Sequence, residues 1–119
     1  MDQPVILVAE DEHILGCDLC DTVTEAGYLV EGPHGNLSEA MLAYQKQKPD
    51  LAILDVQLDD GVVFPLAERM IAEDVPVIFH SGHVSREEIE KRFPKTTSLA
   101  KPCPPDQMLE SVAVALTPA

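Results

Sequence analysis

LAILDVQLDDG, residues 51–61, is the stretch that decides the fold. Its first four residues are apolar, which is typical of a strand that is buried on both faces of a parallel sheet. The run stops at Asp55, and two more acids, Asp59 and Asp60, follow shortly after. Because a buried carboxylate costs several kcal/mol unless it is paired or bound to a metal, Asp55 requires a partner. Asp59 and Asp60 are interpreted as solvated loop or helix-start acids.

Four other short apolar runs are separated from this one, and from each other, by polar stretches that resemble helices. Strands and helices that alternate in this way favour right-handed crossovers and a parallel sheet with helices on both faces. The sequence therefore predicts one α/β domain over residues 1–119. The five predicted strands are residues 5–9, 28–30, 51–54, 76–79 and 97–100.

Five helices are predicted between and after these strands. Gly27 suits the end of the first helix, and Asn36 suits the N-cap of the second. The fourth, over residues 85–93, is short and highly charged. Apolar residues recur at helical spacing in the third and fifth helices. These positions are Val63, Leu66, Ala67 and Met70 in the third helix, and Leu109, Val112, Ala113 and Leu116 in the fifth.

Polar groups gather where the predicted strands end. Glu10 and Asp11 follow the first strand, Asp55 the third, Ser81 the fourth and Lys101 the fifth. In open parallel sheets, ligands bind at the carboxyl ends of the strands, near the point where the strand order reverses. Acids, a hydroxyl and an ammonium group are therefore expected at one edge of the sheet.

These side chains suit a magnesium and phosphoryl site. Three carboxylates that lie close together need a positive charge to offset their repulsion. Mg²⁺ prefers oxygen ligands, commonly a few carboxylates together with waters and a phosphate oxygen. At such a site Asp55 is placed to attack phosphorus and form an acyl phosphate. Lys101 and Ser81 would then hold the charged phosphoryl oxygens.

Four segments, VAEDE, LAILDVQL, PVIFHSG and LAKPC, resemble in order and spacing the receiver domain of bacterial two-component response regulators. The match spans essentially the whole chain, and the four signatures together are far more specific than any one of them. The resemblance implies a flavodoxin-like (βα)5 fold, with a five-stranded parallel sheet in the order 2-1-3-4-5. It also implies a cis peptide bond between Lys101 and Pro102.

The same resemblance assigns roles to the residues at the sheet edge. It implies that Asp55 is the phospho-acceptor, that Ser81 is the switch hydroxyl and that Lys101 contacts the phosphoryl group. The cofactor implied is Mg²⁺. Its implied ligands are the carboxylates of Glu10, Asp11 and Asp55 and the backbone carbonyl of Gln57.

The chain also departs from the usual pattern of that family. Ser98 stands where many members carry an aromatic residue whose rotamer follows the phosphorylated state. We therefore expect signalling to run through the loop that contains His83 and the short helix after it. Gln57, Gly82, His83 and Ser98 are expected to modulate the reaction, and His80 is interpreted as a further neighbour in the loop around Ser81.

Composition excludes several classes of function. The chain has 119 residues, with 8 Lys and Arg against 21 Asp and Glu, so its formal net charge is −13. Such a charge repels nucleic acid and anionic lipid, and neither is expected as a partner. No apolar stretch is long enough to span a membrane and no signal peptide is readable, which favours a cytoplasmic protein. Cys17 and Cys20 are interpreted as packing residues, because no second pair at zinc-site spacing accompanies them.

The function expected from these patterns is that of a stand-alone receiver. Its phosphoryl donor would be a histidine kinase or a histidine phosphotransfer protein, and its output would be binding to an unknown downstream protein. Met1 and the end directly after the last helix favour a complete chain. Such a receiver catalyses its own phosphorylation and dephosphorylation, and is not an enzyme in the usual sense. The alternatives are a phosphate sink or phosphorelay intermediate, a receiver cut from a hybrid histidine kinase, a small phosphatase, and a receiver that binds without phosphorylation.

Overall fold

A five-stranded parallel sheet forms the centre of the computed structural model, which describes residues 3–82 and 86–117. The strand order is β2-β1-β3-β6-β7, and every neighbouring pair is parallel. Counted along the chain, these five strands have the order 2-1-3-4-5, so the predicted fold class is confirmed. Their bounds are Val5–Ala9 (β1), Leu29–His34 (β2), Leu51–Leu54 (β3), Val77–Ser81 (β6) and Thr97–Ala100 (β7).

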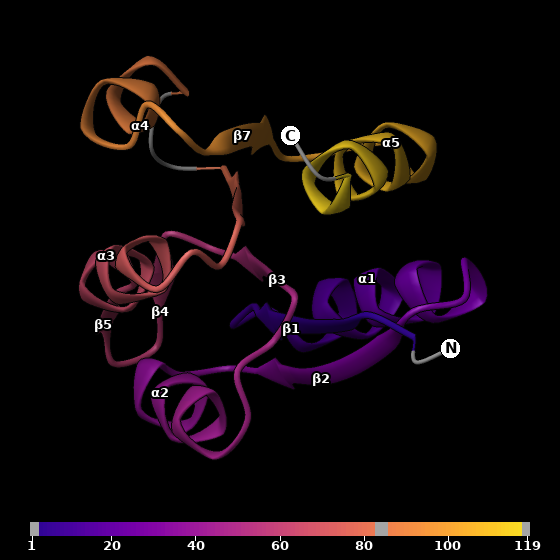
Figure 1. Ribbon diagram of the computed structural model, residues 1–119, viewed down its shortest axis with the longest axis horizontal. Coiled ribbons are helices and arrows are strands. Elements are labelled where there is room, and N and C mark those ends of the chain that lie inside the picture. Colours follow the sequence, from indigo (N-terminus) through magenta and orange to yellow (C-terminus); the bar gives the residue numbers. More distant parts are fainter. Residues whose placement is uncertain (1–2, 83–85, 118–119) are drawn as a thin grey trace.

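Helices cover both faces of the sheet (Figure 1). One buried core joins α1 and α5 to one face, and a second core joins α2, α3 and α4 to the other. None of the helices in the described residues is long and apolar enough to cross a membrane. Their bounds are His13–Glu25 (α1), Leu37–Lys46 (α2), Phe64–Ala72 (α3), Arg86–Arg92 (α4) and Pro105–Leu116 (α5).

The two central strands explain the continuous apolar runs of the sequence. Ile6, Val8 and Ile53 pack on the face covered by α1 and α5, while Leu7 and Leu54 pack on the opposite face. Each of these side chains is at most 1% exposed. Because helices cover both faces, β1 and β3 contain no exposed positions that would require polar residues at alternate places.

Two predicted elements differ in detail from the structure. The second strand extends to His34, through a glycine and a proline that broke the apolar pattern, and an edge strand tolerates both. The fifth helix buries Met108 and Val112, whereas Ala113 of the predicted face is exposed. Met108 is a long, flexible side chain that fills the space beneath the helix, and the buried face is rotated accordingly.

A short hairpin after Asp55 was not predicted. Strands β4 (Gln57–Leu58) and β5 (Gly61–Val62) pair in antiparallel fashion, with Asp59 and Asp60 in the turn. Each strand has only two residues, which is too short for an alternating pattern to be recognised in the sequence. The hairpin follows the carboxyl end of β3 and lies between α2 and α3 (Figure 1).

Gly16 allows α1 to approach the β2 strand closely, and this contact predicts the effect of Gly16→Ala. An added Cβ would lie 2.8 Å from Cβ of Pro33, which is rigid. Alanine normally stabilises a helix interior by about 1 kcal/mol relative to glycine. Here we expect Gly16→Ala to lower the free energy of unfolding by about 1–3 kcal/mol, the usual cost of overpacking. Urea denaturation measures this change.

The exposed Asp21 on the same helix provides the control for this substitution. Asp21→Ala is expected to change the free energy of unfolding by less than about 0.5 kcal/mol. A Gly16→Ala protein that is more stable than the wild type would show that α1 can move away from Pro33 at little cost.

Candidate functional site

Backbone hydrogen bonds of the sheet continue for one residue beyond β1, β3 and β7, and they fix the residue that follows each strand. The amide of Glu10 donates to the carbonyl of His34 at 2.9 Å, and the amide of Asp55 donates to that of Ala9 at 2.9 Å. The amide of Lys101 donates to the carbonyl of Ser81 at 3.1 Å. Glu10, Asp55 and Lys101 therefore start from fixed positions at the carboxyl ends of β1, β3 and β7.

Three carboxylates converge at this edge, as the sequence predicted. Glu10, Asp11 and Asp55 each offer one oxygen, and these oxygens lie within 4.8 Å of one another. Glu10 is 2% exposed and Asp55 is 4% exposed, whereas Asp11 is half-buried. Two carboxylates shielded from water, with a third at the rim, form an oxygen donor set that suits a hard divalent cation such as Mg²⁺.

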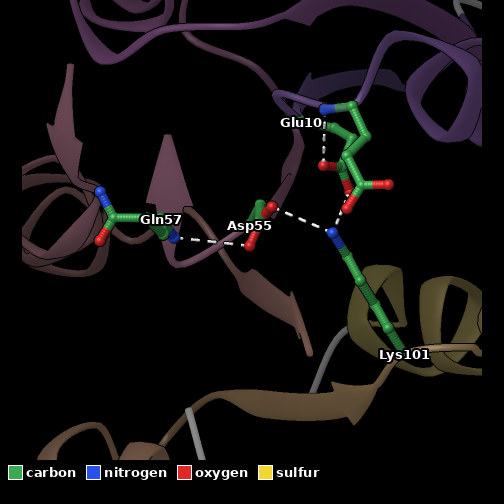
Figure 2. Close-up of polar contacts among 5 residues, drawn as sticks. Glu10, Asp55, Gln57 and Lys101 are labelled. Atoms are coloured by element: carbon green, nitrogen blue, oxygen red, sulfur yellow. Dashed lines mark hydrogen bonds and ion pairs between the residues drawn. The ribbon is translucent and has the colours of Figure 1, made fainter. Parts of the chain in front are cut away.

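Lys101 supplies positive charge to this cluster. Its Nζ lies 2.6 Å from Oε1 of Glu10 and donates to Oδ2 of Asp55 at 3.0 Å (Figure 2). The Lys101 side chain is only 13% exposed. The peptide bond between Lys101 and Pro102 is cis, which confirms that expectation.

The pKa values at the site reflect the competition between burial and pairing. Burial raises the pKa of Glu10 to about 7, although hydrogen bonds from Lys101 and from the amide of Glu12 act in the opposite direction. Burial also acts against the charged form of Lys101, but its bonds to Glu10 and Asp55 outweigh this effect and raise its pKa. Burial alone would raise the pKa of Asp11, yet shared hydrogen bonds with Glu10 and Asp55 lower it. The cluster therefore depends on a cation to stay ionised.

Gln57 presents its backbone, and not its side chain, to the cluster. Its amide donates to Oδ1 of Asp55 at 3.4 Å (Figure 2), and its side-chain amide donates to the carbonyl of Leu58. The amide of Val63 donates to the carbonyl of Val56, so the next pair of the hairpin, Gln57 and Val62, is a non-hydrogen-bonded pair. The carbonyl of Gln57 therefore points away from β5, to the side on which Asp55 lies.

Of the remaining predicted residues, Ser81 and Gly82 lie at the end of β6 and Ser98 lies within β7. Ser81 is the last residue of β6 and is 5% exposed, and the exposed Gly82 follows it beside the Lys101 side chain. Ser98 is 4% exposed and pairs with Phe79, so it lies within the sheet and away from the carboxylates. His83 lies outside the described residues.

His80 differs from its interpretation as a loop residue. It lies inside β6, is 9% exposed, and borders a cavity of about 500 Å³ between α1 and the start of α5. Neither ring nitrogen has a hydrogen-bond partner among the described residues. Burial, together with the charge of Lys101, lowers the pKa of His80, so its ring is neutral and adds no charge to the site.

Asp60 is exposed in the turn of the hairpin, which agrees with its interpretation as a solvated loop or helix-start acid, and it also makes a specific contact. Its carboxylate accepts hydrogen bonds from the amides of Leu37 and Ser38 and from the Ser38 hydroxyl. Asp60 lies beside the start of α2 in space, but 22 or more residues from it along the chain. The sequence therefore contains no local pattern that would predict this contact.

Comparison with known proteins gives a consistent result. A family model described as the response regulator receiver domain matches residues 6–113. The transcriptional regulatory protein PdtaR of Mycobacterium tuberculosis is 32% identical over 90 residues, which cover 72% of this chain and 42% of PdtaR. The phyllosphere-induced regulator PhyR of Methylorubrum extorquens is 30% identical over 114 residues, which cover 93% of this chain and 43% of PhyR. The chain thus spans less than half the length of these relatives.

Solved structures share the fold over nearly their full length. The REC domain of PhyR from Erythrobacter litoralis matches with a TM-score of 0.86 and 29% identity, covering 100% of this chain and 97% of that one. SdrG from Sphingomonas melonis matches with a TM-score of 0.82 and 29% identity, covering 98% and 100% of the two chains. The family match covers most of the sequence and includes all five strands of the sheet except Val5, the first residue of β1. The chain belongs to the response regulator receiver domain family.

Proposed function

We propose that this chain is a phosphoryl acceptor in two-component signalling, with Asp55 as the residue that is modified. The observation that carries the proposal is the placement of Asp55. Its carboxylate is buried at the end of the central strand, belongs to the three-carboxylate cluster, and is in direct contact with the Lys101 ammonium group. A structural acid at the end of a strand would need none of these neighbours.

The proposed cofactor is Mg²⁺, held by Glu10, Asp11, Asp55 and the backbone carbonyl of Gln57. When bound, it would supply positive charge that lowers the cost of bringing an anionic phosphoryl group to a carboxylate. A divalent cation fits the site because the single charge of Lys101 does not offset three carboxylates.

The proposed reaction is an in-line transfer from a phosphohistidine. A carboxylate oxygen of Asp55 attacks phosphorus, so an O–P bond forms as the P–N bond to the imidazole breaks. The imidazole leaves with the electron pair of the broken bond and takes up one proton from solvent, so it departs as neutral imidazole. Lys101 and Ser81 are proposed to hold the phosphoryl oxygens, on which negative charge is concentrated.

The proposed partners are proteins. A histidine kinase or a histidine phosphotransfer protein would donate the phosphoryl group, and an unknown downstream protein would recognise the phosphorylated form. The net charge of −13 supports this choice over direct binding to nucleic acid. PdtaR and PhyR carry further sequence outside the matched region, so their own outputs do not transfer to this chain.

Exposure to a small-molecule phosphoryl donor with Mg²⁺ tests the proposed acceptor. We expect intact-mass spectrometry to show the gain of one phosphoryl group on the wild-type chain. Asp55→Asn and a chelator serve as controls, and each is expected to abolish the gain. A gain that persists in Asp55→Asn would place the modification on another residue, and no gain at all would favour a receiver that binds without phosphorylation.

Lys101→Gln tests the proposed role of the ammonium group. Removing one partner from a buried ion pair typically costs about 3–5 kcal/mol, because the other charges are left uncompensated. We therefore expect a loss of about 3 kcal/mol in the free energy of unfolding in the absence of Mg²⁺. We also expect phosphorylation to slow by about a hundredfold, since one contact to the charged oxygens is lost.

The control for this substitution is Lys95→Gln, at an exposed position away from the cluster. Urea denaturation and the initial rate of phosphorylation are measured for both variants. If Lys101→Gln matches Lys95→Gln in both measurements, the contacts of Lys101 contribute neither to stability nor to the reaction.

A further inference from the structure

The hairpin β4–β5 is attached to the start of α2 by one side chain. Oδ1 of Asp60 accepts from the amide of Leu37 at 2.5 Å, and Oδ2 accepts from the amide and the hydroxyl of Ser38 at 3.2 and 2.8 Å. A second contact lies beside it, since the amide of Asp59 donates to the carbonyl of Gly35 at 3.3 Å. The turn of the hairpin is thus attached to a helix that lies more than 20 residues earlier.

The helix does not need Asp60 in order to begin. Asn36 is already the N-cap of α2, and its side chain accepts from the amide of Glu39 at 2.8 Å. Asp60 satisfies two further amides of the first turn, and its negative charge lies at the positive end of the helix dipole. These hydrogen bonds also hold the pKa of Asp60 below its usual range. Because Asp60 adds to a cap that Asn36 already provides, its hydrogen bonds fix the position of the hairpin as much as they stabilise the helix.

The hairpin itself is too short to hold its own position. Its ladder contains the pairs Gln57–Val62 and Leu58–Gly61, followed by one hydrogen bond from the amide of Val63 to the carbonyl of Val56. An isolated hairpin is marginally stable even when it is longer. Yet this hairpin carries the backbone carbonyl of Gln57, which the proposed function assigns to Mg²⁺ and which points away from β5. A fixed carbonyl requires that the turn at the far end of the hairpin be fixed as well.

We infer that Asp60 is a positioning residue for the metal site, which holds the Gln57 carbonyl in place by attaching the hairpin to the N-terminus of α2. The inference rests on the proposed function, because it assigns the Gln57 carbonyl to Mg²⁺. Asp60 itself contacts neither the metal nor the phosphoryl group in this arrangement. Residues that orient metal ligands in this indirect way commonly affect metal affinity by about tenfold or more.

Calorimetric titration of the full chain with Mg²⁺ tests the inference. We expect Asp60→Ala to raise the Kd for Mg²⁺ by about tenfold. Asp60→Asn keeps one acceptor oxygen and is expected to fall between Asp60→Ala and the wild type. The amide signal of Gln57, followed by NMR, should shift on addition of Mg²⁺ in the wild type and shift less in Asp60→Ala.

Two matched controls separate positioning from charge and from stability. Asp59→Ala removes the neighbouring negative charge and leaves the Asp60 contacts in place, so its Kd is expected to stay within about twofold of the wild type, as for surface charges that are screened by water. Asn36→Ala removes the other cap of the same helix, so it should lower Tm without changing the Kd for Mg²⁺.

The outcomes distinguish this inference from the proposed function. A weaker Kd in Asp60→Ala, with Asp59→Ala and Asn36→Ala close to the wild type, supports the inference. An equal loss of Mg²⁺ affinity in Asp59→Ala and Asp60→Ala would show that only the negative charge contributes. A normal Kd in a folded Asp60→Ala would show that the hairpin keeps its position without Asp60. Either result overturns the inference and leaves the proposed function standing. A wild-type chain that binds no Mg²⁺ would overturn both.

Discussion

The contact between Lys101 and the pair of buried carboxylates, Glu10 and Asp55, is the constraint on which the rest of the structure depends. Two acids that are almost excluded from water would repel each other and favour protonation without a cation between them. The ammonium group lies within 3.0 Å of both. The three side chains come from three different strand ends, so this contact forms only when β1, β3 and β7 are arranged in one sheet. The chemistry of the site and the topology of the sheet therefore require each other.

The same constraint explains why the strands are so apolar. Helices on both faces exclude water from β1 and β3, and the low dielectric at their carboxyl ends strengthens every electrostatic interaction there. That environment raises the pKa of Glu10 and makes an unpaired charge costly. Lys101 contacts both Glu10 and Asp55, while the half-buried Asp11 adds negative charge that suits a divalent cation.

The parallel sheet and the groups at its edge could be predicted because both follow from local patterns, whereas the strand order came from the resemblance to receiver domains. Apolar runs of four or five residues mark the central strands, and the residue that ends each run lies at the carboxyl edge. The hairpin β4–β5 and the role of Asp60 could not be predicted, since they depend on a contact between α2 and a turn that are distant in the sequence. The burial of His80 was missed for a related reason: β6 continues beyond the apolar run, and a polar residue inside a strand resembles a loop.

The two sides of the site are supported differently, and this difference suggests how a change at Asp55 would spread. On the acidic side, the hairpin after Asp55 is attached to α2, so this part of the site is held from two directions. On the opposite side, Lys101 lies beside the exposed Gly82, and α4 is joined to α3 through Arg92, which lies over the ring of Phe64 and pairs with Glu68. A phosphoryl group on Asp55 would change the partners of Lys101 first. Because Lys101 follows β7 and lies beside the end of β6, the response is expected on the side of β6, β7 and α4, which is also the side on which Ser98 leaves no aromatic ring to rotate.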